Sequence, residues 1–284
     1  MARIDKIRPS PIAGTWYEGN RERLGRQIDE FLSNAKTISI TGKIIGLVVP
    51  HAGHHYSGAT AAYAYKAIKG MHFDLVVIIS PLHGYNPAEL ITSAHEAYST
   101  PLGIVPIQQA ALAELTKNLS AAKMNLEKVA YDEEHSLEIQ LPFLQRTLSG
   151  DFGLLPVMMR AQDEKSVEIL AKSLIPILKQ NQSLIIASSD LSHFYPVDMA
   201  NALDKEMLRQ VELFSPQGVL RAEQTGSGSA CGAAPIAAVL LAAKGVGADG
   251  VKLAHYSTSG DVTGDMTSVV GYGSAIIYSS KPAK

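Results

Sequence analysis

The chain has 284 residues, of which 46% are hydrophobic and 18% are charged, and its formal net charge at pH 7 is −2. This composition is typical of a globular protein with a large core, and it excludes a disordered chain and a strongly basic nucleic-acid-binding protein. No apolar run reaches about 18 residues and no hydrophobic stretch begins the chain, so we expect neither a membrane partner nor a secretory signal. The single cysteine, Cys231, excludes an internal disulfide and favours the reducing cytoplasm.

Short apolar runs and amphipathic segments alternate along the chain. Runs rich in valine, isoleucine and leucine predict buried strands over 44–50, 74–80, 153–159 and 183–189. Helical spacing predicts helices over 57–69, 109–119, 134–148, 163–180, 198–213 and 231–244. Strands that alternate with helices indicate an α/β fold in which helices flank a mostly parallel central sheet.

Two segments have a different pattern. Residues 88–108 alternate polar and apolar side chains around Pro101 and Gly103, which predicts a β-hairpin added to the main sheet. Residues 251–280 predict two further strands joined by the sequence GDVTGD. Because no repeat, linker or change of composition divides the chain, we expect a single domain over residues 1–284.

Histidines follow three of the predicted strands. His51 comes directly after the first strand, His83 follows the second, and Asp190 and His193 follow the fourth. The carboxyl ends of parallel strands meet at one edge of a sheet, where ligands bind. A single histidine in such a place is often a turn residue, but three at one edge predict a metal or ligand site there.

Glycine-rich segments contribute further candidates. His54 and His55 share the turn with His51, where they either fill the turn or line the pocket. Cys231 lies between a glycine- and serine-rich loop and a predicted helix, whose amino-terminus should lower the pKa of the thiol. This residue is therefore either a thiolate ligand or, as lone cysteines often are, a small buried apolar residue.

The segment 134–148 carries His135 and Glu138. Their spacing places both on one face of the predicted helix, as pocket walls or supports of the site. The alternative is an acidic first helical turn capped by Asp132. Of the other histidines, we expect surface or purely structural roles for His72, His95 and His255.

Taken together, the motifs resemble a known family. Five segments, taken in chain order, resemble the Memo family, whose bacterial and archaeal members are often called AmmeMemoRadiSam system protein B. These segments are PHAGHHYSG, SPLHGY, DEEHSLEIQLPFL, SSDLSHF and ACGAAPI. The opening RPSPIAGTWYEGN is similar to the same family, so the resemblance covers nearly the whole chain. It implies an α/β fold like the catalytic subunit of class III extradiol dioxygenases, which use non-heme iron.

The resemblance also implies roles for particular residues. His51, His83 and Cys231 match the metal ligands of the family, and Asp190 and His193 match the remaining pocket pair, with His193 placed where the dioxygenases have an acid/base histidine. Family members are linked to iron or copper, to redox chemistry and, in animals, to phosphotyrosine peptides. The bacterial label implies a radical SAM protein and a second small protein as partners.

This chain departs from the family pattern at two places. His54 stands where the family usually has an aromatic residue, which suggests an extra ligand or a changed pocket. Leu82 stands where the family often has a polar residue before the second histidine, so a hydrogen bond that the family shares there is not expected to carry over.

Three functions remain open from the sequence. Two imidazoles and a thiolate suit Fe(II), copper or zinc. The first hypothesis is a dioxygenase-like, metal-dependent oxidoreductase that acts on a small molecule. In it His193 is the base, Asp190 supports His193, and His135 forms a pocket wall or donates a proton. The second is a vestigial site that binds a peptide or partner protein, and the third is a metal-dependent hydrolase or lyase.

Overall fold

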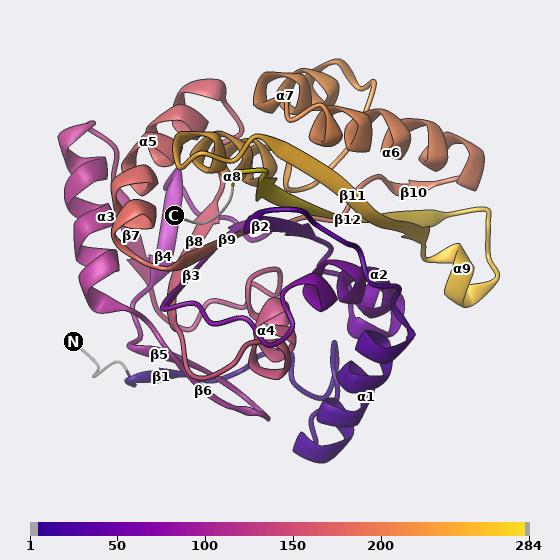
Figure 1. Ribbon diagram of the computed structural model, residues 1–284, viewed down its shortest axis with the longest axis horizontal. Coiled ribbons are helices and arrows are strands. Elements are labelled where there is room, and N and C mark those ends of the chain that lie inside the picture. The colour runs from indigo at the N-terminus through magenta and orange to yellow at the C-terminus, as the bar shows by residue number, and fades with distance from the viewer. Residues whose placement is uncertain (1–4, 282–284) are drawn as a thin grey trace.

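A computed structural model describes residues 5–281, which form a long twisted sheet with helices on both faces (Figure 1). At its centre lie four parallel strands, in the order β2 (Lys43–Val49), β9 (Ser183–Ser188), β3 (Leu75–Pro81) and β8 (Gly153–Met159). These are the four apolar runs of the sequence. Almost every residue in them is buried, because helices cover both faces.

The outer strands make the sheet mixed rather than mostly parallel. On one side β12 (Val269–Ser279) runs antiparallel to β2, and it pairs with β11 (Gly250–Thr258) and β10 (His193–Tyr195). On the other side β4 (Leu90–Ser93) runs antiparallel to β8, and β7 (Leu126–Val129) pairs with β4. The predicted α/β fold is confirmed, and within the main sheet the parallel arrangement is limited to the centre and to the β4–β7 pair.

The predicted hairpin forms, but it does not join the main sheet. Strands β5 (Ala97–Thr100) and β6 (Gly103–Pro106) pair with each other, and β5 pairs with β1 (Ile7–Arg8) in a separate small sheet. Local alternation predicts a hairpin but does not specify which exposed strand edge it will meet. Strand β1 of this small sheet carries Arg8, which bonds the segment that holds Glu134 and His135.

The helices form two layers (Figure 1). On one face of the sheet lie α3 (Gln109–Ala121), α5 (Glu164–Gln180), α6 (Val197–Glu212), α7 (Pro216–Thr225) and α8 (Ala233–Gly245). On the other lie α1 (Arg21–Asn34), α2 (His54–Ala67) and α4 (Leu141–Thr147), and the short α9 (Gly260–Thr263) connects β11 to β12. No helix within residues 5–281 combines the length and the apolar character needed to cross a membrane.

The sequence did not predict the helices α1 and α7 or the short α9, although α1 and α7 carry start signals. The side chain of Asn20 accepts hydrogen bonds from the first turn of α1, and Ser215 does the same for α7. In α1 the buried residues follow helical spacing, at Leu24, Ile28 and Leu32.

The helix predicted over 134–148 is wrong in its first half. Residues 131–137 are irregular, a single 3₁₀ turn covers Glu138–Gln140, and α4 begins at Leu141. The guanidinium of Arg8 donates to the carbonyl oxygens of Asp132 and Glu134, which compete with any helical hydrogen bonds. His135 and Glu138 therefore do not share a helical face.

Candidate metal centre

Three side chains from three separate loops converge at the carboxyl edge of the sheet. His51 follows β2, His83 follows β3, and Cys231 lies two residues before α8. One potential ligand atom from each lies within 4.8 Å of the other two, and Cys231 Sγ is 3.1 Å from Nε2 of His51. Ligands bonded at about 2.0–2.3 Å to a tetrahedral ion lie roughly 3.3–3.8 Å apart, so this spacing is close to that of a metal site.

A stack of rings forms one wall of this centre. The imidazole of His135 stacks on that of His83, with centroids 4.7 Å apart, and lies edge-on to His51 at 5.4 Å. The indole of Trp16 also packs against His135, with ring centroids 4.0 Å apart. Burial is the main cause that lowers the pKa of His135 to about 4, so its ring is neutral at pH 7.

Glu134 supports His83, a contact that the sequence prediction missed. Its carboxylate accepts from Nδ1 of His83 at 3.0 Å and from the backbone N–H of the same residue at 2.6 Å. Burial alone would raise the pKa of Glu134, but these bonds hold it well below its usual range. An ionised carboxylate can only accept, so Nδ1 of His83 carries the proton and Nε2 keeps its lone pair.

Asp190 holds the backbone of the His51 loop. It is buried after β9 and accepts from the backbone N–H of His51 at 2.6 Å and of Ala52 at 3.2 Å. Burial raises the pKa of Asp190 to about 7. The carboxylate thus orients the loop, whereas we expected it to bond an imidazole ring.

His193 lies at the same edge, on β10, and is half-buried. Its Nδ1 donates to the carbonyl oxygen of Leu191 at 2.8 Å, which leaves Nε2 as the basic nitrogen. Burial, and after it the charge of His83, lower the pKa of His193. The next residue, Phe194, has a φ of 63° and is 74% exposed, so the backbone is strained beside this histidine.

The pKa prediction for Cys231 is wrong. Burial, and after it the nearby charge of Asp190, raise the pKa of the thiol well above its usual value. Without a cation at the site, the thiol of Cys231 therefore stays protonated at pH 7. A cation at the site would favour the thiolate, so the donor set fits a metal ion.

His54 and His55 are not brought to the three converging side chains. His54 is buried on the first turn of α2, where Nε2 donates to the carbonyl oxygen of Ile139 at 3.1 Å and the ring packs against Phe143. Burial lowers its pKa to about 4. His55 is exposed and contacts the ring of Tyr56.

Glu138 also faces away from the centre. Its carboxylate is fully buried and bonds the guanidinium of Arg8, the hydroxyl of Ser10 and, at 2.7 Å, the hydroxyl of Tyr17. Arg8 is 1% exposed and also pairs with Asp132 at 2.8 Å. This cluster ties β1 to the loop that carries Glu134 and His135, so it acts on the centre only through the backbone.

Of the remaining three histidines, two lie as predicted and one does not. His72 is exposed and His255 bonds Thr60 from within β11, as predicted. His95 was expected at the surface but is 2% exposed, because its ring nitrogens bond the backbone of Asp5 and Tyr131.

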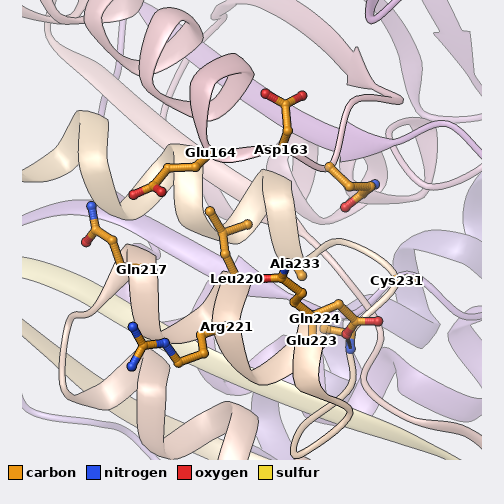
Figure 2. A pocket seen from close by; sticks show the side chains of 11 residues that line it. Asp163, Glu164, Gln217, Leu220, Arg221, Glu223, Gln224, Cys231 and Ala233 are labelled. Carbon is orange, nitrogen blue, oxygen red and sulfur yellow. Dashed lines mark hydrogen bonds between the residues drawn. The ribbon is translucent and has the colours of Figure 1, made fainter.

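Two cavities flank the converging side chains. One of ≈ 510 Å³ is lined by His83, Glu134 and His135 together with the loop after β3. The other, of ≈ 940 Å³, lies between the amino-terminus of α5, α7 and the start of α8, with Cys231 in its wall (Figure 2). Both are large enough for a small organic substrate.

Comparison with known proteins identifies the family. The model of the Memo-like proteins matches residues 8–276. The chain belongs to the Memo family. A MEMO1 family protein of Methanococcoides burtonii is 35% identical over 274 residues, covering 95% of this chain and 100% of that one. Another, from Nitrosopumilus maritimus, is 32% identical over 271 residues, covering 94% and 98%.

Among solved structures, an uncharacterised protein of Escherichia coli K12 is similar at a TM-score of 0.46 and 14% identity, over 82% of this chain and 100% of that one.

Proposed function

We propose that this Memo-family protein binds a transition metal through His51, His83 and Cys231 and carries out redox chemistry, of the dioxygenase type, on a small substrate. The observation that carries the proposal is the convergence of the three ligand atoms within 4.8 Å. The three residues lie far apart in sequence, and each comes from a different strand or helix end.

The donor set narrows the choice of metal. Two imidazoles and one thiolate suit copper and zinc, and Fe(II) is a third candidate. Replacing the carboxylate of a non-heme iron triad with a thiolate makes the site softer, which favours copper. A bound iron or copper ion would supply Lewis acidity and one-electron chemistry.

The surrounding residues would handle protons and substrate. His193 has its basic nitrogen free and a lowered pKa, so at pH 7 it is a neutral imidazole able to accept a proton from a substrate hydroxyl. The neutral ring of His135 forms a wall of the ≈ 510 Å³ cavity, where it would pack against the substrate.

The first test is elemental analysis of protein purified without oxygen, beside a His51→Ala, His83→Ala double variant. We expect about one metal ion per chain in the parent and none in the variant. Equal metal content in the two proteins would contradict the proposal.

The second test separates the redox function from the alternatives. Protein loaded with Fe(II) or copper is incubated with a panel of catechols and oxygen uptake is recorded; uptake supports the redox function, and its absence counts against it. Turnover of esters or phosphoesters by the zinc-loaded protein would favour a hydrolase. Peptide binding that survives the double variant would favour a non-catalytic binding module.

The family also suggests a setting for this activity. We include in the proposal a cytoplasmic location and partnership with a radical SAM protein and a second small protein. Co-purification of the tagged chain with these partners from its own cells, compared with an untagged control, tests that part.

A further inference from the structure

A buried hydrogen-bond network lies behind His51, on the side away from Cys231. It consists of the side chains of Ser188, Gln140 and Tyr65, which are 0–1% exposed. Nδ1 of His51 is 3.1 Å from the hydroxyl oxygen of Ser188. The direction of each bond in this network can be settled by counting donors and acceptors.

Gln140 can take one orientation. One atom of its amide is 2.9 Å from the carbonyl oxygen of Pro50, which only accepts, so that atom is the nitrogen. The amide oxygen then accepts from the hydroxyl of Tyr65 at 2.8 Å. The same amide nitrogen lies 2.8 Å from the Ser188 hydroxyl, so its second proton is donated to Ser188.

Ser188 has no proton left for His51. Its hydroxyl lies 2.5 Å from the carbonyl oxygen of Ser136, which also only accepts, so the single hydroxyl proton is used there. Ser188 must accept from both Gln140 and His51. A neutral His51 therefore carries its proton on Nδ1, and its Nε2 lone pair points to Cys231 Sγ, 3.1 Å away.

We propose that Ser188, oriented by Gln140, is a positioning residue that fixes His51 as the Nδ1–H tautomer and presents Nε2 to the metal before any metal binds. The inference rests on the proposed function for the identity of what Nε2 would bind. Ser188 plays for His51 the part that Glu134 plays for His83, with a hydroxyl in place of a carboxylate. A neutral support adds no negative charge beside a thiolate that already supplies one.

The test reads the tautomer directly in metal-free protein. Long-range ¹H–¹⁵N NMR of ¹⁵N-labelled chain, with His51 assigned by its loss in His51→Ala, distinguishes a protonated ring nitrogen from a bare one. We expect Nδ1 protonated and Nε2 bare in the parent. Protonated Nε2 in the parent would overturn the inference, and no variant is needed for that result.

Variants then connect the tautomer to metal binding. Ser188→Ala should give a mixture of tautomers and weaken metal affinity about 10- to 100-fold, as loss of a partner behind a ligating histidine typically does. Ser188→Thr keeps the hydroxyl and should restore both. The control is Ser274→Ala, which removes a hydroxyl that is equally buried but has no hydrogen-bond partner within residues 5–281.

The outcomes separate the two proposals. A parent chain with the expected tautomer that takes up no metal leaves the network intact and ends the proposed function. A Ser188→Ala variant that keeps the parent tautomer and affinity ends the inference and leaves the metal centre standing.

Discussion

Two short segments each contain a residue that faces the candidate metal centre and another, three or four positions later, that faces the core. His51 points Nε2 at Cys231, whereas His54 donates Nε2–H to a backbone carbonyl in the core. Glu134 bonds His83, whereas Glu138 bonds Arg8. All four are buried, so burial does not mark the functional member. What differs is the partner. His51 and Glu134 bond or face the side chains that converge at the sheet edge, whereas His54 bonds a backbone carbonyl in the core and Glu138 bonds Arg8, Ser10 and Tyr17.

The largest expected effect comes from comparing the two histidines. His51→Ala should lower metal affinity more than about 100-fold, because it removes a ligand and not merely a ligand's support. His54→Phe should leave affinity unchanged, since its ring contacts Phe143 and Ile139 rather than the centre. Competition titrations with a chelator measure both; a loss of metal in His54→Phe would place that residue in the site after all.

The core-facing carboxylate should matter for stability. Glu138→Gln removes one charge from a buried ion pair and should lower the free energy of unfolding by about 3 kcal/mol, the lower part of the usual range because Asp132 still pairs with Arg8. Urea unfolding measures the change. Lys172→Ala breaks an exposed pair with Glu168 and should cost under about 1 kcal/mol. If both variants lost the same small amount, the buried cluster would have no structural importance.

His54 should also make stability depend on pH. Burial lowers its pKa from 6.5 to about 4, so the unfolded chain binds a proton at a higher pH than the folded chain. Stability contributed by the neutral ring is present above pH 6.5, declines as the pH falls, and levels off below about 4, with a total of about 3 kcal/mol. Unfolding curves at pH 7 and pH 5 should therefore differ more for the parent than for His54→Phe. An unchanged difference would show that His54 keeps its ordinary pKa when folded.

The smallest expected effect concerns the site-facing carboxylate. Glu134→Gln keeps the shape but removes the charge that fixes His83, so metal affinity should fall about 10- to 100-fold. The neighbouring Glu133 is exposed, and Glu133→Gln is the matched control. Equal affinities in the two variants would mean that the backbone alone positions His83.

The sequence predicted that His51 and His83 meet at one edge of the sheet better than it predicted the contacts around them. Apolar runs mark the central strands because buried strands need continuous hydrophobic residues, and parallel strands bring their carboxyl ends to one edge, where His51 and His83 meet. Periodicity failed over residues 134–140 of the predicted helix, because the competing partner of the backbone there is Arg8, more than 120 residues away. No local pattern contains that contact.

By itself the sequence determined the α/β class and the central strands, because hydrophobic periodicity is a local property, and its resemblance to the Memo family singled out His51, His83 and Cys231 as candidate ligands. Tertiary structure decided which member of each neighbouring pair faces the centre, that the hairpin joins β1, and that Ser188, Gln140 and Glu134 direct the ring nitrogens. Those outcomes depend on hydrogen bonds between distant segments, and a donor or acceptor buried by folding must be satisfied by whatever the fold places beside it.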